Sequence, residues 1–110
     1  MIEKGNGVEA TLQKIFGTRT HIKLVMLFLG NEEYLNDIAG LARTLNVAHA
    51  TAKKAVIDLT ETEILSEKKI GNSRIIELNK SSPIGLLIQD FIKSLNRIAP
   101  SPSSQIKSEP

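Results

Sequence analysis

The fold is decided by residues 41–65, which read LARTLNVAHATAKKAVIDLTETEIL. Apolar residues recur at helical spacing on both sides of Leu45-Asn46-Val47, so the stretch predicts helices joined by a tight turn. Asn46 suits such a turn because its short polar side chain tolerates a left-handed backbone. Val47 then supplies an aliphatic anchor, whose burial would stabilise the motif by about 1.5–3 kcal/mol.

The helix before the turn is expected to begin at Asn36, a good N-cap, with Asp37 in its first turn. The helix after the turn is expected to run from about Ala48 to Thr62. The core-facing residues of this pair are Ile38, Leu41, Ala42, Leu45, Ala52, Ala55, Val56 and Leu59. The second helix then leaves these residues outward near its start: His49, Ala50, Thr51, Lys53 and Lys54.

Downstream of this pair the apolar pattern changes from helical to alternating. Residues 66–70 and 74–78 predict strands around a Gly71-Asn72-Ser73 turn, with Ile76 and Leu78 on one face. The predicted hairpin is basic and carries Lys68, Lys69 and Arg74, with Asn72 at its tip.

Upstream, further helices are expected. One begins at the capping box of Asn6 and Glu9 and ends at Gly17, and the next runs from Thr18 or Thr20 to Leu29. In the latter, one face is formed by Ile22, Val25, Met26 and Leu29, and is widened by Leu24, Leu27 and Phe28. So apolar a helix is expected to be buried on most sides. Tyr34-Leu35 predicts at most a small strand.

The last helix is predicted over residues 82–98, because Ser82 is a capping residue and Pro83 suits the first helical position. A heptad seam runs along it through Ile84, Ile88, Phe91, Leu95 and Ile98, and is widened by Leu87 and Ile92. We expect this seam to pair with a second copy of the chain as a coiled coil, since an uncovered apolar stripe favours aggregation. The alternative is that the helix folds back on its own core. The N-terminal helix, through Val8, Leu12, Ile15 and Phe16, is a further candidate for the same interface.

The chain of 110 residues is long enough for one domain. We expect a flexible N-terminus over residues 1–6, the domain over 7–98, and a disordered tail rich in proline and serine over 99–110.

The composition argues against an enzyme. Without cysteine there is no disulfide, thiolate nucleophile or sulfur-ligated zinc, and two histidines are too few for a histidine-rich metal cluster. No serine–histidine–carboxylate spacing indicates catalysis, and Gly5-Asn6-Gly7 is not a phosphate loop. We therefore expect no cofactor and no metal. Neither a membrane span nor a secretion signal is evident, so we expect a cytoplasmic protein.

In their order and spacing these elements resemble the winged helix-turn-helix domain. The residues that carry the resemblance are Leu41-Ala42, Leu45-Asn46-Val47, Thr51, Ala55-Val56, Leu59 and Glu63-Ile64-Leu65. It covers roughly residues 18–80 and is closest to small dimeric regulators of the MarR/ArsR type and to archaeal winged-helix DNA binders. It implies a mainly α fold with a small β-hairpin, a C-terminal dimerisation helix, and a nucleoid-associated protein.

The resemblance also implies where double-stranded DNA would be bound. A recognition helix (about 48–62) would enter the major groove by its N-terminal part, and a basic wing (66–78) would lie on the backbone. The candidate contacts are Arg43, His49, Ala50, Thr51, Lys53, Lys54, Lys68, Lys69, Asn72 and Arg74. The acidic residues of this region, from Asp58 to Glu77, are expected to lie away from the groove face.

Two departures from the family pattern favour contacts to phosphate over contacts to bases. Ala48 stands where the family usually has a capping serine or threonine, and the outward face of the helix is short of arginine. A dimeric transcriptional regulator is the expected function. The alternatives are a sequence-tolerant chromatin or segregation protein, and a winged helix used for protein–protein assembly. The sequence does not identify a small-molecule effector.

Overall fold

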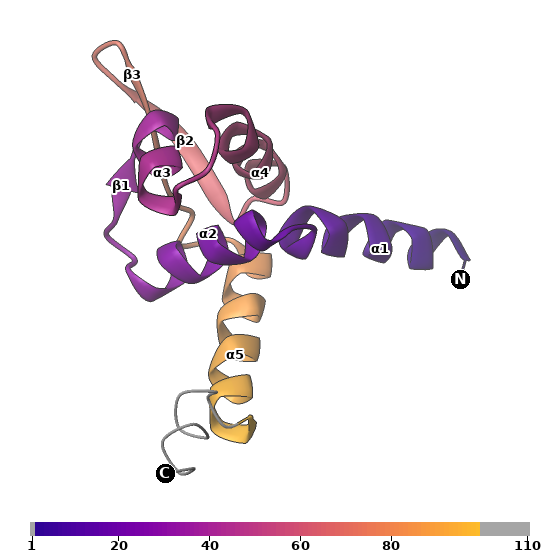
Figure 1. The fold of residues 1–110 in the computed structure, drawn as a ribbon. Helices are drawn as coiled ribbons and strands as arrows, with labels where there is room; N and C mark the ends of the chain where they lie inside the picture. The colour runs from indigo at the N-terminus through magenta and orange to yellow at the C-terminus, as the bar shows by residue number, and fades with distance from the viewer. Residues whose placement is uncertain (1, 100–110) are drawn as a thin grey trace, which may run out of the picture.

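The computed structural model describes residues 2–99, and the side chains of residues 7–99. This part of the chain holds five helices and a three-stranded sheet (Figure 1). The order is α1 (Ile2–Phe16), α2 (Arg19–Gly30), β1 (Leu35–Asn36), α3 (Ile38–Leu45), α4 (His49–Glu61), β2 (Leu65–Ile70), β3 (Ser73–Leu78) and α5 (Pro83–Ile98). None of the helices described is long and apolar enough to cross a membrane.

The helix-turn-helix is formed by α3 and α4. Asn46 has φ 58°, as predicted, and the backbone N–H of Val47 donates to Ala42 O over 3.0 Å. Val47 is half-buried, and the inward residues predicted for α4 are all buried: Ala52, Ala55, Val56 and Leu59. The core lies between α2, α3, α4 and the sheet, and its largest fully buried side chains include Phe28, Leu24, Leu41, Leu59 and Ile76.

The sheet is antiparallel in the order β1-β3-β2. Its long hairpin is the wing of a winged helix-turn-helix fold, and Ile76 and Leu78 are buried as predicted. The turn is one residue shorter than expected, because Ser73 pairs with Ile70 and belongs to β3. Gly71 has φ +62°, the positive value that favoured two-residue hairpin turns need at this position.

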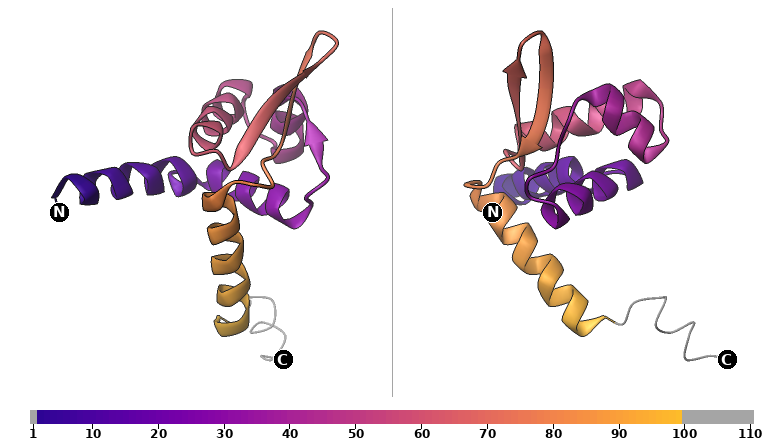
Figure 2. Two further views of the ribbon diagram at one scale, coloured as in Figure 1. Left: turned by 180° about the vertical axis from the view of Figure 1, so that it is seen from behind. Right: turned by 90° about the vertical axis from the view of Figure 1, so that its left-hand side faces the viewer.

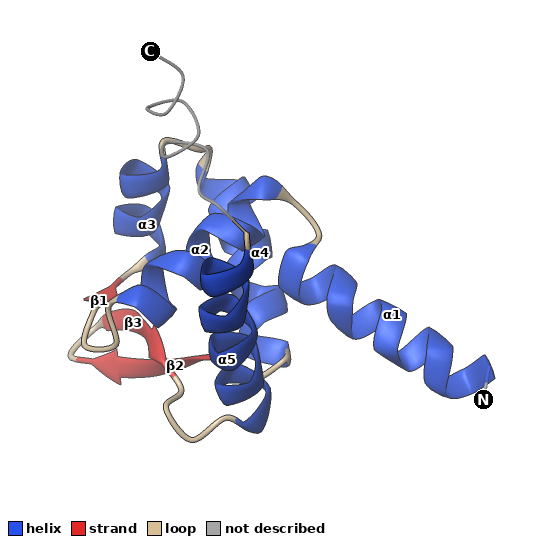
Figure 3. Ribbon diagram, turned by 90° about the horizontal axis from the view of Figure 1, so that it is seen from below, coloured by secondary structure: helices blue, strands red, loops and turns tan. Residues whose placement is uncertain are grey.

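Two helices, α5 and α1, project from the rest of the domain. The wing and α5 point in opposite directions (Figures 1 and 2), and α1 runs out to one side of the other helices (Figure 3). The start of α5 is the predicted one, since Ser82 Oγ accepts from the N–H of Gly85 over 2.9 Å and Pro83 follows.

Other predictions about the helices were wrong in detail. Asp37 is the N-cap of α3, and not Asn36: Asp37 Oδ1 accepts from Gly40 N–H over 2.7 Å. Asn36 is held in β1, where its Nδ2 donates to the hydroxyl of Tyr34. On α2, the predicted inward residues Ile22 and Met26 are exposed, because its neighbours cover the opposite side, which carries Leu24, Val25 and Phe28.

The terminal predictions differ as well. α1 begins at Ile2, so the expected flexible segment 1–6 is helical over 2–6 and the Asn6 capping box is not a helix start. Glycine within a helix costs only about 1 kcal/mol relative to alanine, which is too little to end one. The predicted disordered tail lies outside the described residues from position 100 onward.

Candidate nucleic-acid interface

The predicted outward residues of α4 are all exposed: His49, Ala50, Thr51, Lys53 and Lys54. They occupy the first turns of the helix, on the face opposite the buried alanines and Leu59. Arg43 is exposed in the last turn of α3, next to this helix start in the motif. The surface offers cations and small side chains.

The start of α4 has no side-chain cap. Ala48 is the N-cap, with φ −65° and ψ 150°, and makes no side-chain hydrogen bond. The first backbone N–H groups of a helix have no partner within the helix, and alanine has no oxygen to accept from them. These N–H groups are therefore free to donate to an anion placed at the helix start.

The register of the wing divides its cations between two faces. Lys69 pairs with Arg74, and Lys68 pairs with Ile75. Paired residues share a face and successive residues alternate, so Lys69 and Arg74 lie on the same face as the buried Ile76. Lys68 lies on the other face. Only two of the three predicted wing cations can therefore point to the side of the sheet that faces the helices.

The acidic residues are closer to these cations than expected. Arg74 Nε lies 3.3 Å from Glu67 Oε2, and Lys68 Nζ lies 3.3 Å from Glu77 Oε1. The prediction that the carboxylates lie away from the basic surface is thus wrong for the wing, because strand alternation puts each acid diagonally across from a base. Within residues 7–99, Lys53, Lys69 and Arg43 have no ion-pair partner.

A hollow of about 380 Å³ lies between α4 and the wing. Lys53 and Arg74, both predicted DNA contacts, line it together with Glu61 and Glu67, and its floor includes the exposed Ile57. The fold therefore brings Lys53 of α4 and Arg74 of the wing to one site. Asn72 is exposed at the tip of the wing.

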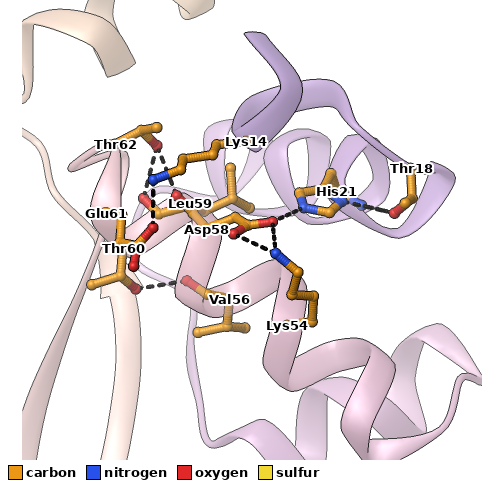
Figure 4. A network of polar contacts seen from close by, with 10 residues as sticks. All are labelled: Lys14, Thr18, His21, Lys54, Val56, Asp58, Leu59, Thr60, Glu61 and Thr62. Atoms are coloured by element: carbon orange, nitrogen blue, oxygen red, sulfur yellow. Dashed lines mark hydrogen bonds and ion pairs between the residues drawn. The ribbon is translucent and has the colours of Figure 1, made fainter. Parts of the chain in front are cut away.

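A network of hydrogen-bonded polar side chains between α2 and α4 was not predicted (Figure 4). His21 Nε2 of α2 donates to Asp58 Oδ2 over 2.7 Å, and His21 Nδ1 lies 2.7 Å from Thr18 Oγ1. Lys54 Nζ donates to both carboxylate oxygens of Asp58, over 3.0 and 3.1 Å. The spacing of Lys54 and Asp58 along one helix face was visible in the sequence, but the histidine partner was not.

The charge on Asp58 is stabilised by these partners. Burial alone raises the pKa of the Asp58 carboxyl, but the hydrogen bonds from His21 and Lys54, with their charges, outweigh it and lower the pKa below its ordinary value. Asp58 is therefore a carboxylate at neutral pH. Among the residues with described side chains, no group of three His, Cys, Asp or Glu could hold a metal ion.

The predicted dimer residues lie on α5, far from the wing (Figure 2). Ile88 is buried against its own domain, Ile84 and Ile92 are half-buried, and the rest of the stripe is exposed: Leu87, Phe91, Leu95 and Ile98. A groove of about 570 Å³ between α1 and α5 brings Leu87 and Ile88 together with Val8 and Leu12. Both candidate helices thus line one open apolar groove.

No family model matches the chain, and no curated protein matches it in sequence. Solved structures share its fold. HlyU from Vibrio cholerae N16961 has a TM-score of 0.63 at 15% identity, over 86% of this chain and 97% of that one. Reduced HlyU from the same organism has a TM-score of 0.62 at 15% identity, over 91% and 97%. A possible transcriptional regulator from Methanosarcina mazei Go1 has a TM-score of 0.56 at 20% identity, over 93% and 84%.

Proposed function

We propose that this protein is a homodimeric transcriptional regulator that binds double-stranded DNA. The observation that carries the proposal is the position of Lys53, on the exposed start of α4, beside the wing face that holds Lys69 and Arg74. A helix start fits the major groove, where base edges differ, while a basic hairpin suits the adjacent phosphates. The free N–H groups after Ala48 add a phosphate site at the helix start.

The apolar stripe of α5 supports the dimer. Leu87 is 66% exposed and Ile98 is 79% exposed in the single chain, and the groove that Leu87 lines is bordered by α1. A second copy related by a two-fold axis would bury the same stripe on both chains. Because α5 and the wing project in opposite directions, this pairing leaves both wings free (Figure 1). The two recognition helices would then serve adjacent major grooves, about 34–36 Å apart.

The regulatory role is supported by a protein of similar fold that is described as a possible transcriptional regulator. Sequence-tolerant binding is the second candidate. It is favoured by the exposed residues at the start of α4, between His49 and Lys54, which include no arginine, asparagine or glutamine and leave lysine as the one residue type there that makes bidentate contacts to bases.

Binding to duplex DNA over a range of salt concentrations tests the proposal. If Arg43, Lys53 and Lys69 engage on each protomer, a dimer neutralises about six phosphates and log K falls against log [salt] with a slope of about −5. Lys53→Ala with Lys69→Ala should make the slope shallower. Lys93→Ala, which removes an exposed lysine from α5, is the matched control and should not. A slope near zero for the wild type would contradict DNA binding and favour a protein–protein module.

Mapping of bound DNA across the genome separates the two DNA-binding candidates. A few sharp sites are expected for a regulator, and uniform coverage for a sequence-tolerant protein.

A further inference from the structure

Asp58 is a buried carboxylate on the recognition helix itself. The side chains of Asp58 and His21 are only 8% and 5% exposed, and they meet across the contact between α4 and α2 (Figure 4). Breaking a buried pair by removing one partner is costly, because the remaining charge is left uncompensated. The Asp58 carboxylate is thus tied to α2 by its contact with His21.

The histidine is fixed from its other side as well. Its Nδ1 lies 2.7 Å from the hydroxyl of Thr18, the N-cap of α2, which also accepts from the backbone N–H of His21. Both ring nitrogens therefore have partners. The carboxylate of Asp58 is held at one place by groups that do not belong to the candidate DNA surface.

This arrangement decides where the ammonium of Lys54 lies. Lys54 Nζ contacts both oxygens of Asp58, which is one helical turn further along α4. Its charge is thus drawn toward the C-terminal half of α4 and away from the first turn, which is the part that would enter the major groove. The neighbouring Lys53 has no carboxylate partner within residues 7–99, although its side chain starts from the same turn.

We propose that Asp58, fixed by His21, withholds Lys54 from DNA and so limits the affinity of the recognition helix. Asp58 is then a positioning residue that acts through Lys54. The inference rests on the DNA-binding function proposed above. It predicts that two adjacent lysines, equal in charge and both exposed, contribute unequally to binding.

The first test compares Lys53→Met with Lys54→Met, which remove the same charge from neighbouring positions. Lys53→Met should weaken DNA binding by on the order of tenfold at about 0.1 M salt and make the salt slope shallower by about 2 for a dimer. Lys54→Met should change affinity less than twofold and leave the slope as it is. Equal losses for both variants would overturn the proposal.

The second test frees Lys54. Asp58→Asn keeps an oxygen that can accept from His21, and should tighten binding several-fold with a slope steeper by about 2 for a dimer. Glu33→Gln is the matched control: it also removes one negative charge, but from an ion pair with Lys80 outside α4 and the wing, and should leave affinity unchanged. When combined with Lys54→Met, Asp58→Asn should no longer tighten binding, whereas a merely structural effect would persist.

The outcomes separate this inference from the proposed function. If the wild type shows no salt-dependent binding, and Lys53→Met no loss, the DNA-binding function fails and this inference falls with it. If Lys53→Met weakens binding and Lys54→Met does so equally, only the inference fails. Thermal melts establish that each variant is folded, and should Asp58→Asn not fold, the comparison of the two lysines decides alone.

Discussion

At the scale of single residues, Ala48 leaves the second helix of the helix-turn-helix without a side-chain cap. Its backbone has the extended conformation of an N-cap, and its carbonyl accepts from the N–H of Ala52 over 3.0 Å, but its side chain makes no capping hydrogen bond. A hydroxyl at this position would accept from one of the N–H groups that have no partner. The missing cap therefore lowers the stability of the free protein and leaves the helix start open to an anion.

Ala48→Ser should stabilise the free protein by about 0.5–1.5 kcal/mol, as capping residues do relative to alanine. Denaturant melts of both proteins measure the difference. Ala50→Ser, inside the first turn, is the control and should bring no gain, because the capping geometry places the N-cap side chain, and not one within the first turn, to accept from these N–H groups. A neutral or destabilising effect of Ala48→Ser would mean that a side-chain oxygen cannot reach these N–H groups.

Asp58 makes stability depend on acidity. Its pKa is lowered in the folded state, so its contribution is present above the pKa of the unfolded state, about 3.9, and is lost as the pH falls through the folded value. Chemical denaturation at pH 7 and near pH 3 should show that the wild type loses more stability over this interval than Asp58→Asn. Lys54→Met, which removes one of the groups that lower the pKa, should lose an intermediate amount. Equal acid losses in all three proteins would contradict this role of Asp58.

At the scale of elements, the wing shows how strand alternation sorts neighbouring charges. Lys68 and Lys69 are adjacent in sequence but lie on opposite faces of the sheet, and Lys68 forms an ion pair with Glu77. The sequence predicted a basic wing whose carboxylates lie away from the groove face. The strand register, which the sequence did not specify beyond the turn, decides which cations lie on the face of the sheet that is turned toward α4.

Lys69→Ala should therefore reduce DNA affinity more than Lys68→Ala, although both remove one lysine from the same strand. The loss should be similar for all DNA sequences, because phosphate contacts carry no sequence information. Competition binding with several duplexes measures both properties. Equal effects of the two substitutions would mean that the wing contacts DNA by its edge or tip and not by one face.

Features that depend on local interactions could be predicted from the sequence, whereas features that depend on contacts between distant segments could not. The turn at Asn46, the start of α5 at Ser82 and the buried face of α4 depend on local chemistry and helical periodicity, and they were predicted correctly. The face of α2 could not be chosen, because its apolar residues surround the helix and only the packing of its neighbours selects Leu24 over Ile22. The pairing of His21 with Asp58 requires α2 and α4 to be in contact, and no local pattern indicates it.

At the scale of the whole molecule, the candidate DNA surface and the exposed apolar surface lie on different parts of the fold. The wing and the start of α4 form the candidate DNA surface, while α5 points away from the wing and α1 runs out to one side, and both helices carry exposed apolar residues (Figures 1 and 3). Contiguous exposed apolar surface of this kind marks an interaction site. The fold thus leaves room for a partner on α1 and α5 that does not obstruct DNA.

Phe91→Glu tests whether that partner is a second copy. The wild type should be a dimer at micromolar concentration in light scattering, and a charge in the seam should give monomers or insoluble protein, because a carboxylate would be buried against apolar side chains. Leu86→Glu is a close control: Leu86 and Phe91 are both 53% exposed on α5, but Leu86 lies outside the heptad seam. Leu86→Glu should stay dimeric.

A monomeric wild type would reject the dimer, and dissociation by Leu86→Glu as well would place the interface on another face of α5. Because a dimer offers two recognition helices to one duplex, soluble Phe91→Glu monomers should also bind DNA with about half of the wild-type salt slope, since the phosphate contacts of the second protomer are lost.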